Sequence, residues 1–296
     1  MPRIVDAAWQ RWWAYVAAPP RRLASLAAAR IVLGIAGVHW YLAVGAERGL
    51  LFGQDGARVP PSGWSFATWW PEGIDVLWWV GLLLAAACAV LGGHAVVAAH
   101  ALVYIAFINR NPLVADSGDR LATCVLPLLA CTVTDAMWSP LAARRRARLA
   151  RREVVAAGDV VHNVALAALV GQVALVYVSA ALWKLGGRAW VGGTAVGTIV
   201  RLDDYRLWGL PGFVLDHPVL VNGLTWAVIA LQAAVVPLLL MARRERRWAI
   251  VVVIALAGFH LSTALVMGLV SFGLHAIGAD LVLLPERDRV PARGSP

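Results

Sequence analysis

The residue of this sequence best suited to unusual chemistry is its single lysine. Lysine and arginine together number 26, and only Lys184 among them is lysine. Arginine stays protonated, whereas a desolvated lysine can lose its proton and act as a base or a nucleophile. A chain that uses arginine wherever a cation suffices therefore predicts a chemical role for Lys184. The alternative is structural, because a lysine at a helix end can extend its ammonium group to the lipid headgroups.

A second candidate, His260, lies midway along a long apolar segment. An ionisable side chain at such a depth usually faces the interior of a helical bundle or a wet cavity. We expect His260 either to relay protons as a deeper polar partner of Lys184 or to bond to a neighbouring helix as a neutral histidine. His39 and His275 lie nearer the same end of the molecule as Lys184, where they would line the same cavity and bind substrate.

The polar connection at 110–119 supplies further candidate substrate-binding residues. They are Asn111, Asp116 and Asp119. A carboxylate beside Lys184 would keep the lysine charged, whereas a dry pocket would favour the neutral amine. The same Asp-Ser-Gly-Asp turn is also expected to cap the next helix, with Ser117 or Asp119 at the N-cap.

Arg30 lies inside the first long apolar segment, with no acidic residue within one helical turn. An unpaired buried charge is expensive, so Arg30 needs a partner from another helix or a substrate anion. We expect an ion pair with Asp135 or Glu153, and we keep Arg30 as a candidate substrate-binding residue. Histidines and carboxylates do not pair at metal-ligand spacing on any one helix, so no metal site is predicted.

The elements that must position these residues are membrane helices. Apolar residues make up 60% of the 296 residues, charged residues make up 15%, and the mean hydropathy is +0.71. A soluble domain is about a quarter charged, and a bilayer crossing needs about 20 apolar residues. Apolar segments that suit a crossing recur at 23–46, 74–91, 94–109, 121–137, 160–185, 218–242 and 248–270, and a shorter one covers 272–284.

Arginine clusters predict how the chain is oriented. Six arginines lie between Arg144 and Arg152, and four lie between Arg243 and Arg247. Positive charge of this kind is retained on the cytoplasmic side of a membrane. The predicted fold is therefore all-α, a polytopic membrane helical bundle of about eight spans with a short last span and both termini cytoplasmic. Lys184 then lies at the outer face, and no basic soluble module remains that would bind nucleic acid.

Three parts follow from this pattern. Residues 1–20 are rich in tryptophan and predict an amphipathic helix that lies in the membrane interface. Residues 21–285 form the transmembrane domain, and 286–296 form a cytoplasmic tail. Within the long outer loop, the apolar stretch 190–200 predicts a re-entrant or interfacial segment.

Several short motifs carry a resemblance to a known family. They are Ala29-Arg30, the turn 116–119, the segment 178–185 around Lys184 with the Trp190-Val191-Gly192 and Ala195 that follow it, Phe259-His260, and 268–272. On these residues the chain resembles the HTTM superfamily, the membrane module shared with vitamin K-dependent gamma-carboxylases. Within that superfamily it is most similar to the sporulation-delaying protein B family, and the resemblance runs over about 22–284.

The resemblance implies both a chemistry and a setting. The carboxylase lysine that matches Lys184 is regarded as the base that helps to deprotonate vitamin K hydroquinone, which implies a membrane quinone or quinol as cofactor. The sporulation-delaying group instead implies maturation of a secreted antimicrobial peptide at the outer face of a bacterial membrane, alongside a small companion protein.

Three functions therefore compete. The leading hypothesis is an inner-membrane maturation factor for a secreted antimicrobial or toxin peptide, with Lys184 as base or nucleophile, His260 as its partner and Trp190 among the substrate-binding residues. The second is a quinol-dependent enzyme that resembles a carboxylase or epoxidase. The third is a non-catalytic membrane partner of a soluble maturation protein. The expected partners are the peptide precursor, the companion protein and membrane lipid.

Overall fold

The computed structural model describes residues 2–56, 59–151, 154–202, 208, 210 and 212–285, and the side chains from residue 6 onward. This part of the chain is all-helical and contains no strand, as predicted. The predicted tail, 286–296, lies outside the described residues.

Five helices are long and apolar enough to cross a membrane. They are α2 (Leu23–Gly45), α4 (Ile74–Val90, preceded by the 3-10 turn η2, Pro71–Gly73), α8 (Ala157–Gly186), α12 (Pro218–Ala242) and α13 (Arg247–Met267). The other three predicted spans correspond to shorter helices of 17, 14 and 11 residues. These are α5 (His94–Arg110), α6 (Ser117–Ala130) and α14 (Val270–Asp280), which continues as the 3-10 turn η5 (Leu281–Leu283).

Local sequence signals account for several helix ends. Pro218 opens α12, where its missing N–H costs nothing and its fixed φ suits the first helical turn. Gly268 ends α13 with a φ of 75°, a left-handed conformation that glycine adopts without steric cost. The bounds of α12 match the prediction for 218–242, because its hydrophobic run has clear terminators at both ends.

The predicted fourth span, 121–137, is wrong at its C-terminal end. α6 stops at Ala130, and 131–141 form an irregular loop. Side-chain contacts hold this loop in place of helical hydrogen bonds. The Val133 N–H of the loop donates to His162 Nδ1, and Thr134 Oγ1 of the loop accepts from the Gly93 N–H. An apolar composition alone could not distinguish this loop from helix.

The remaining elements are α1, of 15 residues, and several shorter helices and turns. They are α1 (Pro2–Val16), α3 (Arg48–Phe52), η1 (Phe66–Thr68), η3 (Pro112–Val114), α7 (Ala142–Ala150), α9 (Arg188–Val191), α10 (Ala195–Ile199) and α11 (Gly212–Leu215). The apolar stretch predicted at 190–200 thus belongs to two short helices rather than to one segment. The predicted interfacial helix within 1–20 corresponds to α1.

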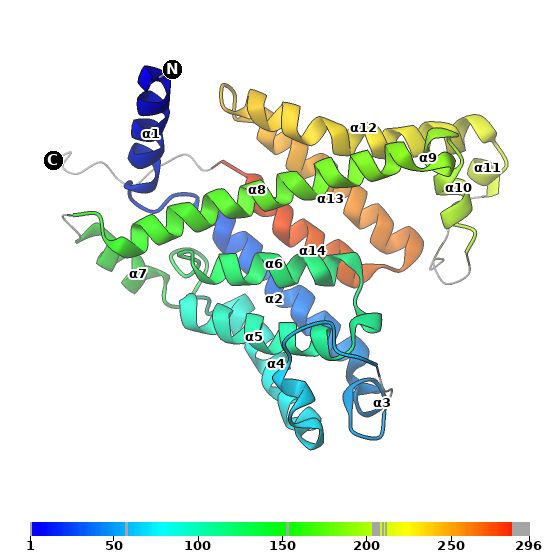
Figure 1. The fold of residues 1–296 in the computed structure, drawn as a ribbon, viewed down its shortest axis with the longest axis horizontal. Helices are drawn as coiled ribbons and strands as arrows, with labels where there is room; N and C mark the ends of the chain where they lie inside the picture. Colours follow the sequence, from blue (N-terminus) through cyan, green and yellow to red (C-terminus); the bar gives the residue numbers. More distant parts are fainter. Residues whose placement is uncertain are drawn as a thin grey trace.

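Helix α14 is the central element of the bundle. It packs against α2, α6 and α13, while α12 packs against α8 and α13. Figure 1 shows α14 between α13 and α6, with the long helices α8, α12 and α13 on one side of it. Because α14 touches helices from both halves of the chain, its side chains can join residues that lie far apart in the sequence.

The two ends of the bundle differ in charge. We call the end that carries α7 and the 243–247 turn the arginine end, and the end that carries Lys184 and α9 to α11 the lysine end. Helix α8 runs from the first end to the second, and α12 runs back beside it. In Figure 1, α1 lies at the arginine end and runs across the direction of the long helices. That orientation suits a helix in the plane of a membrane.

Candidate functional site

A buried polar cluster joins α8, α13 and α14. The Tyr177 hydroxyl lies 2.7 Å from His260 Nε2 and 2.8 and 2.9 Å from the two carboxylate oxygens of Asp280. His260 Nε2 lies 3.4 Å from Asp280 Oδ2. These three side chains are at most 4% exposed. We call them the Asp280 cluster.

The hydrogen bonds of the Asp280 cluster define its protons. With Asp280 ionised, Tyr177 donates its single proton to the carboxylate, and the Tyr177 oxygen then accepts from Nε2–H of His260. His260 Nδ1 then carries no proton, and it is buried without a hydrogen-bond partner. The cluster therefore holds a hydroxyl between a carboxylate and an imidazole, with one basic nitrogen unused. Such an arrangement can accept and pass on a proton.

Asp280 has no cationic partner of the usual kind. Among the described residues, no lysine or arginine forms an ion pair with it, and its only charged neighbour would be a protonated His260. A buried carboxylate without a cation is costly, and ionisable groups inside a membrane bundle usually serve a function. This cluster is therefore the strongest chemical feature of the bundle.

Lys184 occupies the last turn of α8, at the lysine end. Its Nζ lies 4.9 Å from the centre of the Trp190 ring, in a cation–π contact. It follows Tyr177 by seven residues, which places the two side chains on one helix face about 10 Å apart along the axis. Ala181 lies between them on that face and is buried.

The structure does not bring Lys184 next to its other predicted partners. No carboxylate among the described residues forms an ion pair with Lys184, and His260 bonds to Tyr177 instead. Among the described residues, no hydrogen bond or ion pair joins Lys184 to Asn111, Asp116 or Asp119, so a site shared by the lysine and the 110–119 loop stays a prediction. What joins Lys184 to His260 is the shared face of α8 and the Tyr177 hydroxyl.

A second polar cluster joins α5, α6 and α14. Asp119 Oδ1 accepts from the Tyr104 hydroxyl at 2.7 Å and from the Ser271 hydroxyl at 2.9 Å. The same oxygen lies 3.3 Å from His275 Nδ1. Asp119 Oδ2 accepts from the backbone N–H of Asp116 at 3.0 Å. We call Tyr104, Asp119, Ser271 and His275 the Asp119 cluster.

The Asp119 cluster includes the start of α6. Asp116 is the N-cap residue and accepts from the Asp119 N–H at 2.8 Å, which completes a reciprocal capping box. The predicted capping turn is therefore present, but the N-cap is Asp116 and not Ser117 or Asp119, because the extended φ and ψ of Asp116 aim its side chain at the first turn. Burial, followed by the nearby charge of Asp119, raises the pKa of Asp116 above its ordinary value.

Two other histidines lie near the Asp119 cluster. His39 is close enough to His275, Asp119 and Asp116 for their charges to interact. The ring of His100 lies 5.7 Å from that of Tyr104, and both side chains are fully buried. The predicted grouping of His39 with His275 thus has a structural counterpart, centred on Asp119 rather than on Lys184.

Asn111 and Arg30 serve local structure. Asn111 donates to Leu51 O at 2.9 Å and accepts from the Leu113 N–H at 3.1 Å, which ties the start of η3 to α3. Arg30 donates to the carbonyl oxygens of Cys88, Ala89 and Trp138 at 2.6 to 2.9 Å. It thereby satisfies carbonyls at the C-terminal end of α4.

The ion pair predicted between Arg30 and Asp135 is wrong. Asp135 pairs with Arg145 at 3.3 Å, because α7 folds back over the 131–141 loop. The other predicted partner, Glu153, lies outside the described residues. Carbonyl oxygens at a helix end carry partial negative charge, so they can stabilise a buried guanidinium in place of a carboxylate.

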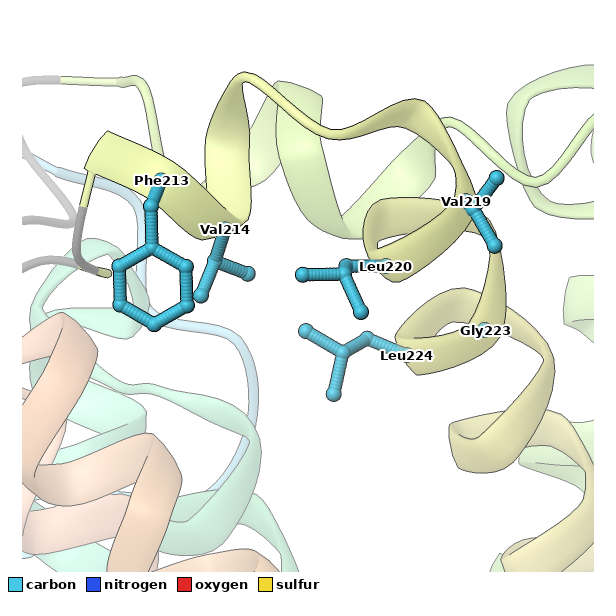
Figure 2. A pocket seen from close by; sticks show the side chains of 6 residues that line it. All are labelled: Phe213, Val214, Val219, Leu220, Gly223 and Leu224. Carbon is cyan, nitrogen blue, oxygen red and sulfur yellow. The ribbon is translucent and has the colours of Figure 1, made fainter.

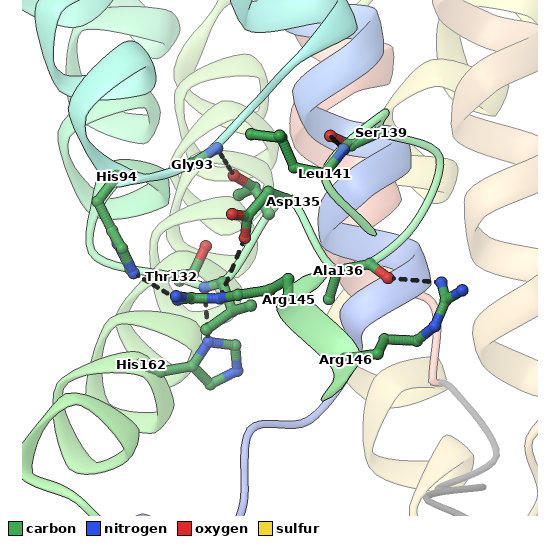
Figure 3. A network of polar contacts seen from close by, with 12 residues as sticks. Gly93, His94, Thr132, Asp135, Ala136, Ser139, Leu141, Arg145, Arg146 and His162 are labelled. Atoms are coloured by element: carbon green, nitrogen blue, oxygen red, sulfur yellow. Dashed lines mark hydrogen bonds and ion pairs between the residues drawn. The ribbon is translucent and has the colours of Figure 1, made fainter. Parts of the chain in front are cut away.

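A network of polar contacts surrounds the 131–141 loop at the arginine end (Figure 3). Arg145 lies 3.0 Å from His94 Nε2, and Arg146 donates to Ala136 O at 2.9 Å. His94 Nδ1 lies 2.7 Å from Ala130 O, so it donates to that carbonyl. This network holds the loop to α5 and α7, away from both buried clusters.

The lysine end carries an apolar hollow of about 440 Å³ between α11 and the first turns of α12 (Figure 2). It is lined by Phe213, Val214, Val219, Leu220, Gly223 and Leu224. None of these is ionisable, and none was a predicted site residue. The hollow can seat an apolar group but can supply no catalysis.

Sequence reasoning missed Tyr177 and Asp280. A signal for each was available, since Tyr177 precedes Lys184 by two helical turns and Asp280 is a carboxylate inside the last apolar segment. Neither signal shows that the two side chains meet. Among the described residues, no group of three histidine, cysteine or acidic side chains could hold a metal ion.

Comparison of the chain with protein-family models, with curated proteins and with solved structures finds no match. The features of the molecule that bear on its function are therefore the geometry of the buried clusters and the motif residues around Lys184. Of these, the Asp280 cluster offers the more specific chemistry.

Proposed function

We propose that this chain is a bacterial inner-membrane enzyme that matures a secreted antimicrobial or toxin peptide by proton transfer at the outer face. Lys184 acts as the base, and the Asp280 cluster accepts or returns the proton. The observation that carries the proposal is the buried Asp280 carboxylate, which has no lysine or arginine partner among the described residues. It bonds to Tyr177, which lies on the face of α8 that leads to Lys184.

The orientation follows from charge. Arginines gather at one end of the bundle, and positive charge marks the cytoplasmic side of a membrane. This charge distribution supports an orientation with the lysine end outside, where a secreted peptide would arrive. The apolar hollow at the same end supports the proposal, because it can seat an apolar side chain of such a peptide.

The choice of a peptide as the substrate is supported by the resemblance to the sporulation-delaying protein B family. A quinol is the second candidate substrate or cofactor. It is favoured by the depth of the Asp280 cluster, because a lipid-soluble molecule can reach a centre inside the bundle more easily than a polar chain can. A quinone absorbance in lipid extracts of the purified protein would support this second candidate.

The test of the base is Lys184→Arg, which keeps the charge and removes the accessible basicity. With the protein in proteoliposomes and a candidate precursor peptide, we expect the rate of product formation, followed by mass spectrometry, to fall about 100-fold or more. The matched control is Arg188→Lys, an exposed cation on α9 at the same end, which should leave the rate unchanged. Wild-type rates with Lys184→Arg would overturn the proposal.

The single lysine also permits a test of orientation. A membrane-impermeant amine reagent, added to intact cells, should modify Lys184, and peptide mapping separates this site from the N-terminal amine. Lys184→Arg supplies the blank. Modification only in inverted vesicles would place the lysine end inside and would contradict an outer-face reaction.

A further inference from the structure

Helix α7 presents two different arginine faces at the arginine end. One face points toward the protein, where Arg145 meets Asp135 and His94, and Ala142 is buried. Arg146 also bonds inward, to Ala136 O. These contacts use two of the four arginines of α7 to hold the 131–141 loop, as Figure 3 shows.

The other face carries arginines without partners. Arg144, Arg148 and the C-cap residue Arg151 are spaced at i, i+4 and i+7, so they form one stripe along the helix. All three are exposed, and among the described residues no hydrogen bond or ion pair involves their side chains. Three unpaired guanidinium groups on one stripe make a surface that matches anions, and phosphate above all, because guanidinium binds phosphate in bidentate fashion.

Helix α1, at the same end of the bundle, indicates the surroundings of this stripe. Trp9, Trp12 and Trp13 are exposed on α1, and tryptophan favours the headgroup layer of a membrane. Asn163 near the start of α8 donates to the carbonyls of Val16 and Ala18, which fixes the end of α1 to the bundle. Asn163 belongs to α8, which is the next helix after α7 in the sequence.

We propose that the arginine stripe of α7, formed by Arg144, Arg148 and Arg151, binds the phosphate groups of anionic phospholipids. Anionic phospholipid is the expected ligand because its phosphate complements the guanidinium charges. The tryptophan-rich helix α1 at the same end also indicates that the stripe lies at the depth of the headgroups. This inference is independent of the proposed reaction, since it concerns the opposite end of the molecule.

Lipid binding at the stripe has a structural consequence. The same helix holds the 131–141 loop through Arg145 and Arg146, and the loop in turn bonds to the start of α5 through Thr134 and Gly93. Anionic lipid that orders α7 therefore stabilises the packing of α5 and α6. A ligand that binds only the folded state raises the unfolding temperature.

The experiment uses the full chain in detergent, titrated with spin-labelled phosphatidylglycerol or phosphatidylcholine. Each arginine near an anionic surface contributes about fivefold, so we expect phosphatidylglycerol to bind about 100-fold more tightly. Changing Arg144, Arg148 and Arg151 together to glutamine should remove most of this preference and the rise in unfolding temperature. The matched control changes Arg243, Arg244 and Arg246 to glutamine, which removes equal charge from the same end.

Three results would overturn the proposal. Equal binding of the two lipids by the wild-type chain would exclude selectivity for anions. An equal loss of preference in the control would show diffuse charge instead of a site on α7. Displacement of bound phosphatidylglycerol by an acidic peptide or a short oligonucleotide at lower concentration would assign the stripe to another class of partner. Elution of each variant as a monodisperse peak confirms that it is folded.

Discussion

The two buried clusters use the same three residue types in opposite ways. Each contains a tyrosine, an aspartate and a histidine, and both include residues of α14, which carries Ser271 and His275 toward one cluster and Asp280 toward the other. Asp119 receives the Tyr104 and Ser271 hydroxyls and a backbone N–H, and His275 lies beside it. Asp280 receives one hydroxyl proton and has His260 as its other neighbour.

The number of hydrogen-bond donors to each carboxylate distinguishes a polar group that stabilises the fold from one that can exchange protons. A carboxylate whose acceptor capacity is used by fixed donors rigidifies the fold, as Asp119 does at the start of α6. A carboxylate bonded to a single shared proton, beside an imidazole with a free nitrogen, retains the capacity to exchange protons. The number and kind of donors, and not burial alone, distinguishes the two.

The largest expected effect is on activity, from Asp280→Asn. The amide is nearly the same size as the carboxylate but cannot accept a proton at neutral pH. We expect peptide maturation to fall about 100-fold or more, while the free energy of unfolding changes by about 1 kcal/mol or less, because a buried charge is removed along with its bonds. Product formation and thermal unfolding in detergent measure the two quantities. A wild-type rate would remove the Asp280 cluster from the mechanism.

The opposite pattern is expected for Asp119→Ala. Three donors, on Tyr104, Ser271 and Asp116, would lose their acceptor inside the protein. We expect the free energy of unfolding to fall by about 3 kcal/mol or more, since each unsatisfied buried donor costs about 1 to 3 kcal/mol. Denaturant unfolding of this variant beside Asp280→Ala measures the contrast. An equal loss in both would mean that the clusters are alike in their structural role.

The smallest effect concerns the N-cap of α6. Because the pKa of Asp116 is raised in the folded state, the stability linked to it is present at acidic pH and is lost as pH rises through the folded pKa. Asp116→Asn keeps the capping oxygen and should remove this pH dependence. Asp116→Ala should lose the cap and about 1 kcal/mol of stability at every pH. Unfolding temperatures across a pH series distinguish them, and an unchanged pH profile in the asparagine variant would assign the dependence elsewhere.

The sequence by itself determined the helical class and most element positions. Runs of apolar residues with Pro218 or Gly268 at their ends specify helices locally, because backbone hydrogen bonding within a helix involves residues four apart. The same reasoning placed Lys184 at a helix end, and the oddity of a single lysine made it a candidate. These inferences need no knowledge of which helices touch.

Tertiary structure decided the partners. Tyr177 and Asp280 are separated by 103 residues, and Arg30 reaches carbonyls 58, 59 and 108 residues away. Such pairs depend on which helix faces meet in the bundle. Hydrophobic periodicity in the sequence does not identify these faces, because membrane helices are apolar on nearly every face. The end of α6 at Ala130 was decided in the same way, by tertiary contacts of the loop that follows it. His162 accepts from the Val133 N–H, and Thr134 accepts from the Gly93 N–H at the start of α5. Local pattern therefore predicted the helices and the lysine, and only packing brought a tyrosine, a histidine and an unpaired carboxylate together.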